Sequence, residues 1–501
     1  MDCDRACMPA LQSGARVYFI GIKGTGMCAL AELMHNSGIR VSGSDRDEVF
    51  YTDSILRELG IPYHESFQAE HIEPPVDLVI YSAAYSFETN PEMAEAQRLG
   101  IPILKYTDAL GHYSLGFDSS AVAGVHGKTT TTAMAGSLIR GAGLPAQILV
   151  GSAVKGFNDR STLNLGKKYF VAETCEYRRH FLSFHPRRII LTSVESDHQD
   201  YYPTYELIRD AFMEYGRLLP AGGELIYCAD DAGAREVAAA LDREGRGITL
   251  VPYGFSAPGD YRIESYEVSN ERAVMRIAGF PGELKLRIPG RHEALNAAAA
   301  LALTSSLVRK EFGDGNSECK NSGNDSEGWN EERRENVRRA LEDFRGSKRR
   351  SEIIGEEGGI LFMDDYGHHP TAVYTTLEGL KDFYPQRRLI VSFMSHTYTR
   401  TASLLDAFAA SFEKADMVIL HKIYGSAREE YHGGVTGETL AEKTKALRNN
   451  VFYVEEPLEA AGLLKGILKA GDLFVTMGAG DNWKLGGSLY EYYKHQNGAG
   501  R

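Results

Sequence analysis

The sequence contains no apolar run that approaches the roughly 18 residues needed for a membrane-spanning helix. Its first residues, MDCDRACMPALQSGAR, lack the apolar segment of a secretory signal, so we expect a cytoplasmic protein. A basic block is also missing, and the formal net charge is −13. Because nucleic-acid and membrane-surface binding depend on clustered cations, we expect neither kind of partner.

Cysteine is sparse and is not paired in the sequence. There are six cysteines in 501 residues, and none forms a C-x-x-C pair. They are Cys3, Cys7, Cys28, Cys175, Cys228 and Cys319. In a chain of this length, that distribution indicates reduced thiols rather than a disulfide framework.

Strand and helix patterns alternate in three successive stretches, which predicts an α/β protein with three domains. The expected domains cover residues 1–116, 117–346 and 347–501. In the second, three segments between residues 261 and 288 alternate with period two and predict a small antiparallel sheet. A polar, Gly/Ser/Asn-rich stretch at about 313–334 predicts a mobile surface insertion.

The segment GVHGKTT follows an apolar strand and precedes a long helical pattern. A standard phosphate-binding loop would need glycine at position 122, where this chain has Val122. The shortened loop still directs backbone N–H groups at phosphates, with Lys128 near the β/γ oxygens and Thr129 near Mg²⁺. A glycine-rich turn with surface side chains is the less favoured alternative. The residues expected to bind ATP here are Gly124, Val125, His126, Gly127, Lys128, Thr129 and Thr130.

Two clusters of possible metal ligands follow at the ends of predicted strands. Glu173 and Glu176 lie in VAETCEYRRHFL, and Asp197 and His198 lie in SVESDHQDYY. Carboxylates at strand ends are well placed beside nucleotide phosphates, and Mg²⁺ prefers oxygen ligands. Each cluster alone is typical of a solvated loop, but beside the glycine loop both become candidate ligands.

Six motifs occur in an order that resembles the Mur ligases, the ATP-dependent amide-bond-forming ligases of peptidoglycan precursor synthesis. They are GVHGKTTTT, VAETCE, DHQDYY, PGRHEALNA, DDYGHHPTAV and SHTYTRT. The resemblance extends from about residue 16 to 490. It implies a Rossmann-like nucleotide-sugar domain, a central P-loop ATPase-like domain and a Rossmann-like C-terminal domain. DDYGHHPT and the spacing of His396 and Arg400 are most similar to members that join L-alanine to UDP-N-acetylmuramate.

The resemblance also implies roles for individual residues. Lys128, Glu173 and His198 are expected to be catalytic. Thr129 and Glu173 are expected to hold Mg²⁺, and His198 is expected to hold a second Mg²⁺. His292 and Asn296 match positions that line the adenine pocket, and Arg349 is the expected basic residue near the phosphates. The residues expected around the incoming amino acid are Tyr366, His368, His396 and Arg400.

The first domain has a second glycine-rich turn, Gly21-Ile22-Lys23-Gly24-Thr25-Gly26-Met27. Its spacing disfavours NAD, and Lys23 stands where the resembled ligases have glycine, which leaves a charge contact from Lys23 open. The residues expected to bind the UDP-sugar are Gly21, Gly24, Thr25, Gly26, Met27, Asp45 and Ser82. Other departures are Cys175, Tyr177, Arg178 and Ser193, and Cys175 is expected to be an incidental thiol.

The function that the resemblance implies is ATP-dependent ligation of L-alanine to the lactyl carboxylate of UDP-N-acetylmuramate through an acyl phosphate. The expected cofactors are ATP and Mg²⁺, and the expected state is a monomer or homodimer. A murein tripeptide ligase of the same family is the nearest alternative. A folylpolyglutamate-type ligase, a non-catalytic nucleotide-binding regulator and an NAD-dependent dehydrogenase are less favoured.

Overall fold

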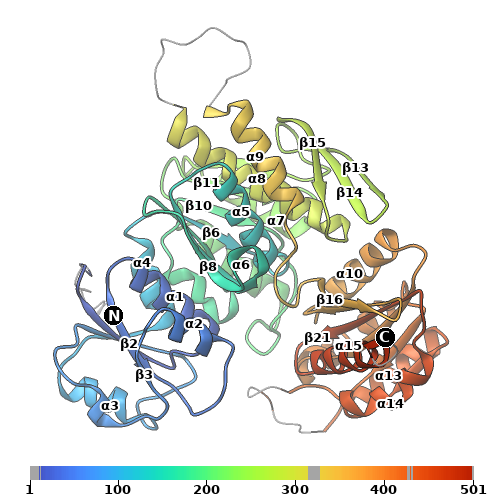
Figure 1. The fold of residues 1–501 in the computed structure, drawn as a ribbon. Helices are drawn as coiled ribbons and strands as arrows, with labels where there is room; N and C mark the ends of the chain where they lie inside the picture. The colour runs from blue at the N-terminus through green and yellow to red at the C-terminus, as the bar shows by residue number, and fades with distance from the viewer. Residues whose placement is uncertain (1–10, 12, 314–327, 426–428, 430–432, 499–501) are drawn as a thin grey trace.

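The computed structural model describes residues 11, 13–313, 328–425, 429 and 433–498. Figure 1 shows three α/β bodies in chain order, blue at the N-terminus, green to yellow in the middle and orange to red at the C-terminus. Three cysteines and most of the expected polar insertion lie outside the described residues. Cys28, Cys175 and Cys228 are free thiols, as expected. Among the described residues, no helix has the length and apolarity needed to cross a membrane.

The first body is built on a five-stranded parallel sheet with the order β3-β2-β1-β4-β5. Its strands are β1 (Arg16–Ile20), β2 (Arg40–Ser44), β3 (Tyr63–His64), β4 (Leu78–Tyr81) and β5 (Ile103–Lys105). Its helices are α1 (Thr25–Asn36), α2 (Thr52–Glu58), α3 (Pro91–Arg98) and α4 (Tyr106–Ser114). The strand order reverses between β1 and β4, which places a ligand crevice at the carboxyl ends of these two strands.

The middle body has a seven-stranded sheet with the order β12-β11-β10-β6-β9-β7-β8, parallel except at the β7–β8 edge. Its strands are β6 (Asp118–Ala123), β7 (Ala146–Val154), β8 (Arg160–Asn164), β9 (Tyr169–Glu173), β10 (Arg188–Leu191), β11 (Glu224–Cys228) and β12 (Thr249–Tyr253). Its helices are α5 (Lys128–Gly141), α6 (Tyr205–Gly216), α7 (Ala232–Arg243), α8 (Arg291–Phe312) and α9 (Glu331–Glu342). The buried alanines of α8 allow α5 and α8 to pack closely.

The expected antiparallel sheet is present beside this body. It contains β13 (Ile263–Ser269), β14 (Arg272–Ile277) and β15 (Phe280–Leu286). The end of the expected polar insertion differs from the prediction. Trp329 is buried edge-on against Phe280, and the Asn330 side chain caps α9 by accepting a hydrogen bond from the Arg333 backbone N–H. The burial of Trp329 and the Asn330 cap therefore anchor the end of a segment whose composition is typical of a surface loop.

The C-terminal body has a six-stranded sheet with the order β16-β17-β21-β18-β19-β20, parallel except for β16. Its strands are β16 (Glu352–Glu357), β17 (Ile360–Asp365), β18 (Arg388–Met394), β19 (Met417–Leu420), β20 (Val451–Tyr453) and β21 (Asp472–Gly478). Its helices are α10 (Pro370–Phe383), α11 (Tyr398–Ser403), α12 (Leu405–Ala410), α13 (Gly437–Leu447), α14 (Ala460–Ile467) and α15 (Trp483–Gly498).

Two ion pairs with buried carboxylates join the three bodies. Glu32 on α1 pairs with Arg160 on β8 and accepts a hydrogen bond from the Thr162 hydroxyl at 2.6 Å. Arg400 on α11 pairs with Asp197, which follows β10. Glu32, Asp197 and Arg400 are buried and Arg160 is partly buried, so separating the bodies would leave a buried carboxylate in each pair without its cation.

Candidate active site

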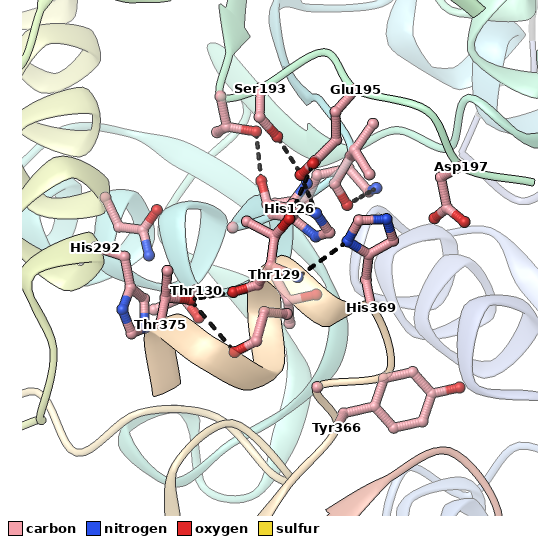
Figure 2. Close-up of a pocket in the computed structure, with 18 of the residues that line it drawn as sticks. His126, Thr129, Thr130, Ser193, Glu195, Asp197, His292, Tyr366, His369 and Thr375 are labelled. Atoms are coloured by element: carbon pink, nitrogen blue, oxygen red, sulfur yellow. Dashed lines mark hydrogen bonds and ion pairs between the residues drawn. The ribbon is translucent and has the colours of Figure 1, made fainter. Parts of the chain in front are cut away.

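A cavity of about 590 Å³ lies between the middle and C-terminal bodies. Its walls come from the glycine loop, the segments after β9 and β10, the start of α8 and the start of α10. Figure 2 labels side chains from the loop, the segment after β10, α8 and α10. Fourteen of the residues expected in the ATP, metal and amino-acid sites line it. They are Val125, His126, Gly127, Lys128, Thr129, Thr130, Glu173, His198, His292, Asn296, Tyr366, His368, His396 and Arg400.

The glycine loop is held open toward the cavity by its neighbours. The Ser193 backbone oxygen and hydroxyl accept hydrogen bonds from the Val125 and His126 N–H groups at 3.1 and 2.9 Å. Gly127 has φ +77°, and a Cβ there would lie 2.6 Å from the Asn296 side-chain oxygen, so only glycine fits. No side chain caps α5, which leaves the N–H groups of its first turn available to an anion.

Lys128 is engaged by a buried carboxylate. Its ammonium donates to Glu176 at 2.9 and 3.2 Å and to the Gly124 carbonyl at 2.6 Å. Burial disfavours the charged ammonium, but the Glu176 carboxylate outweighs this and raises the pKa of Lys128. Burial opposes ionisation of Glu176 as well, and the Lys128 charge still lowers its pKa. A bound phosphate would therefore have to compete with Glu176 for this ammonium.

The oxygen ligands expected for Mg²⁺ are adjacent. The Thr129 hydroxyl donates to Glu173 Oε1 at 3.0 Å, and the Gly151 N–H donates to Glu173 Oε2 at 2.8 Å. A hydroxyl beside a fixed carboxylate is a donor set that fits Mg²⁺. His198 lies with its Nε2 3.2 Å from Glu176 Oε1 rather than beside Glu173. The two clusters flagged in the sequence thus meet through Glu176.

Arg400 forms a buried ion pair with Asp197, a contact that the sequence did not predict. Its Nε and Nη2 both donate to Asp197 Oδ1, at 2.9 and 2.7 Å, and each residue is only 4% exposed. Burial opposes ionisation of Asp197, but the guanidinium keeps its pKa below the usual range. Nη1 lies 3.3 Å from His396 Nδ1. An arginine can bind an amino-acid carboxylate through two N–H groups, but Nε and Nη2 of Arg400 both donate to Asp197, and only Nη1 is directed at His396.

The expected amino-acid residues of the C-terminal body gather around His368. Its Nδ1 lies 2.8 Å from the Tyr366 carbonyl, and its ring contacts those of Tyr366 and His396 at centroid distances of 4.9 and 5.7 Å. Burial, reinforced by the Arg400 charge, holds the pKa of His368 well below its ordinary value. The imidazole is therefore neutral at physiological pH.

A cluster missed in the sequence links the glycine loop to α10. His126 pairs with Glu195, and Glu195 Oε2 accepts a hydrogen bond from the Thr371 hydroxyl at 3.1 Å. His369, whose side chain caps α10, lies with its ring centroid 4.9 Å from that of His126. Among the described residues, His126, Glu195 and His369 are the one trio with possible metal-ligand atoms within 4.8 Å of one another. The repeated histidine in GHHP was the available signal for His369.

At the opposite end of the cavity, Asn296 supports the loop. Its side-chain oxygen accepts from the Thr131 hydroxyl at 3.0 Å, and its amide donates to Glu293 at 2.9 Å. His292 Nε2 lies 3.4 Å from the same Glu293. Burial would lower the pKa of His292, but Glu293 more than offsets this and raises it. Asn296 thus shapes the loop as well as lining the pocket.

The two linker arginines differ from the expectation. Arg349 does not line the cavity, because its guanidinium donates to Asp364 at 2.8 Å and to the Gly478 carbonyl at 2.8 Å. Arg350 lines the cavity instead and lies over the Tyr366 ring at 5.2 Å. The adjacent positions in RGSKRR gave no means of telling the two apart.

The residues expected to bind the nucleotide sugar lie outside this cavity, at the carboxyl end of the first sheet. Thr25, Gly26 and Met27 form the first turn of α1, which has no side-chain cap. The Lys23 ammonium is engaged inside the first body rather than free for the charge contact that the sequence left open. This ammonium is 1% exposed and is bound to Asp53 and Glu65 at 3.2 and 3.1 Å. Lys23 therefore stabilises the glycine-rich turn at residues 21–27 through its ion pairs with Asp53 and Glu65.

Cys175 lines the cavity beside Glu176. The residue is exposed to the cavity, but crowding of the thiol by neighbouring groups, together with the Glu176 charge, raises the pKa of Cys175 to about 12. A thiol that stays protonated is a poor nucleophile, in keeping with an incidental role.

Comparisons with known proteins cover all three bodies. The model of the Mur ligase family catalytic domain matches residues 16–118, that of the Mur ligase middle domain matches 122–304, and that of the Mur ligase glutamate ligase domain matches 349–480. The UDP-N-acetylmuramate–L-alanine ligase of Treponema pallidum strain Nichols is 51% identical over 492 residues, covering 98% of this chain and 99% of the relative. The ligase of the same name from Borrelia garinii is 38% identical and covers 94% and 97%.

A solved structure gives the same result. The UDP-N-acetylmuramate-alanine ligase of Thermotoga maritima matches with a TM-score of 0.73 and 26% identity, covering 96% of this chain and 99% of that one. The murein peptide ligase of Psychrobacter arcticus, at 24% identity and a TM-score of 0.62, supports the fold alone. With all three domain models matched in order and a full-length relative at 51% identity, the chain belongs to the Mur ligase family.

Proposed function

We propose that this protein joins L-alanine to the lactyl carboxylate of UDP-N-acetylmuramate, using ATP and Mg²⁺ and releasing ADP and phosphate. The observation that carries the proposal is the single cavity shared by the glycine loop and the amino-acid residues of the C-terminal body. The named activity of the full-length relatives supports the choice of substrates. We further propose domain boundaries near residues 116 and 346, and a cytoplasmic reaction, since ATP and nucleotide sugars are made there.

The chemistry requires activation of a carboxylate. A lactyl oxygen attacks the γ-phosphorus of ATP, ADP leaves, and the resulting acyl phosphate is attacked at carbon by the L-alanine amine. The amine loses a proton, the tetrahedral intermediate collapses, and phosphate leaves. Lys128 exchanges Glu176 for the transferred phosphoryl oxygens, and the uncapped first turn of α5 donates N–H groups to them.

Thr129 and Glu173 would hold one Mg²⁺, and His198, which lies beside Glu176, would hold a second. The two ions would neutralise charge on the phosphates. Arg400 Nη1 and His396 would receive the carboxylate of L-alanine. Neutral His368, beside both, is suited to accept a proton from the attacking amine. The contact of the C-terminal body over the glycine loop would exclude water from the acyl phosphate.

The test is phosphate release by the purified protein with ATP, Mg²⁺ and UDP-N-acetylmuramate. Release that depends on L-alanine is the expected result. Release only with L-Ala-γ-D-Glu-meso-diaminopimelate would show a tripeptide ligase and would overturn the assignment of the amino-acid residues. Omitting UDP-N-acetylmuramate controls for ATP hydrolysis, and release without either acceptor would refute the ligase proposal.

A further inference from the structure

Two histidines and a glutamate from two different bodies meet at one end of the cavity. His126 belongs to the glycine loop, Glu195 follows β10, and His369 immediately precedes α10. Figure 2 shows the three side chains close together. Each offers one possible ligand atom, and these atoms lie within 4.8 Å of one another. The cluster therefore has the size of a site for a single metal ion.

One nitrogen of this cluster is buried and open to a ligand. His369 is 5% exposed, and its Nε2 has no hydrogen-bond partner among the described residues. Its Nδ1 accepts a long hydrogen bond, 3.4 Å, from the Thr371 N–H. Coordination through Nε2 would place the ring proton on Nδ1 and give up only this weak contact. Burial, reinforced by nearby His126, lowers the pKa of His369, so the imidazole is neutral at physiological pH, as a metal ligand must be.

The glutamate is held with one oxygen toward each histidine-bearing element. Glu195 Oε1 pairs with His126 Nε2, and Oε2 accepts a hydrogen bond from the Thr371 hydroxyl at 3.1 Å. Burial opposes ionisation of Glu195, but the contact with His126 outweighs this and lowers its pKa, so the carboxylate is charged. An outer hydrogen bond that orients a ligating carboxylate is typical of metal sites, and Thr371 supplies one here.

We propose that His126, Glu195 and His369 bind one transition-metal ion of the zinc class, separate from the Mg²⁺ ions of the proposed reaction. Imidazole nitrogen favours zinc and its neighbours in the first transition row, whereas Mg²⁺ prefers oxygen ligands. Two histidines and one glutamate are a donor set that zinc uses with a fourth position left open, and all three residues line the cavity. Since His126 and Glu195 lie in the middle body and His369 in the C-terminal body, the ion would hold the glycine loop to the start of α10.

The experiment titrates the full-length protein with Co²⁺, a spectroscopic substitute for Zn²⁺, in an excess of Mg²⁺. The expected result is a site with tetrahedral Co²⁺ absorption and no thiolate charge-transfer band, displaced by Zn²⁺ but not by more Mg²⁺. His369→Asn keeps a side chain that can cap α10 but removes the ligand. It is expected to weaken Co²⁺ binding by at least about 100-fold, since groups that only support a ligand already contribute about 10–100-fold, and His126→Asn is expected to do the same. His292→Asn and Cys175→Ser change other residues of the same cavity and are matched controls, expected to keep the wild-type affinity.

Wild-type Co²⁺ affinity in His369→Asn would overturn the proposal, and so would wild-type affinity in His126→Asn, because the ion would then not join the two bodies. A thiolate band, or loss of binding in Cys175→Ser, would assign the ion to cysteine. Displacement by Mg²⁺ would place it among oxygen ligands, and either result refutes the site. If a histidine variant does not fold, Glu195→Gln removes a ligand at nearly constant size, and unchanged affinity there is equally decisive. Because the titration contains no ATP or amino acid, its failure would leave the proposed ligation standing.

Discussion

Lys128→Met is predicted to destabilise the middle body as well as abolish phosphoryl transfer. The lysine is the strongest partner of Glu176, a carboxylate that is only 2% exposed. His198 Nε2 remains 3.2 Å from Glu176 Oε1, but this one contact does not replace the two contacts that the Lys128 ammonium makes with the carboxylate. Once Lys128 is gone, Glu176 stays charged without compensation or takes up a proton. Breaking a buried pair in this way generally costs about 3–5 kcal/mol.

Uptake of a proton by Glu176 limits that loss of stability, because a neutral carboxyl group no longer needs the Lys128 charge. A carboxyl with an unfolded-state pKa of roughly 4.3 costs about 1.36 kcal/mol for each pH unit above that value, or about 3.7 kcal/mol at pH 7 and about 1 kcal/mol at pH 5. The sign follows from linkage. In the variant, burial raises the folded-state pKa of Glu176 above its unfolded value, so the penalty vanishes in acid and grows as the pH rises.

The assay uses the two tryptophans. Trp329 lies in the middle body and Trp483 in the C-terminal body, so a Trp483→Phe background reports unfolding of the middle body alone. In that background, Lys128→Met is compared with Lys128→Met/Glu176→Gln by urea unfolding at pH 7 and pH 5. The double variant is expected to regain stability at pH 7 but not activity. A single variant as stable as the parent, or a deficit that does not shrink at pH 5, would refute the reasoning.

Three further predictions concern the contacts between the middle and C-terminal bodies. Asp197→Asn is expected to lower kcat by about tenfold or more, equivalent to about 1.4 kcal/mol, because Arg400 loses its charged partner; steady-state kinetics with unchanged kcat would contradict this. His396→Ala is expected to raise the KM for L-alanine more than that for ATP, since His396 adjoins Arg400 Nη1, and equal effects would rule out this role. Glu195→Gln and Thr371→Val are each expected to weaken binding of a non-hydrolysable ATP analogue by a few-fold, with a combined effect smaller than the product of the two, because they share one hydrogen bond. Independent effects on the measured dissociation constant would show that this contact does not couple α10 to the glycine loop.

The central strands and their helices were predictable because their patterns are long and apolar. β1, β6, β10 and β18 are buried runs followed by glycine or polar turns, which is the pattern that predicted alternating strands and helices. Most of the missed strands are short or lie at sheet edges; the exception is β7, which has nine residues and lies between β9 and β8. β3 has two residues, too few to show a period, and β8 is the antiparallel edge of its sheet. Such strands are defined by their neighbours rather than by their own side chains.

The site residues were predictable through motifs, but their partners were not. Arg400 was assigned to a substrate carboxylate, whereas its partner Asp197 lies 203 positions earlier in another body. The sequence left open a charge contact from Lys23. In the structure Lys23 is buried and pairs with Asp53 of helix α2 and with Glu65, which follows β3. A motif identifies chemically capable side chains, while long-range packing decides which charge each of them meets.

The segment between Thr192 and His198 explains why the proposed reaction would need both bodies. Its Glu195 contacts the glycine loop through His126 and α10 through Thr371, and its Asp197 binds Arg400. If the C-terminal body moved away, Arg400 would lose its carboxylate and Glu195 would lose its Thr371 hydrogen bond in the same step. The amino-acid residues would then be separated from the loop that activates the carboxylate. The amino-acid site would therefore form in the same step that covers the acyl phosphate. The carboxylate would then not be activated before L-alanine can react with it.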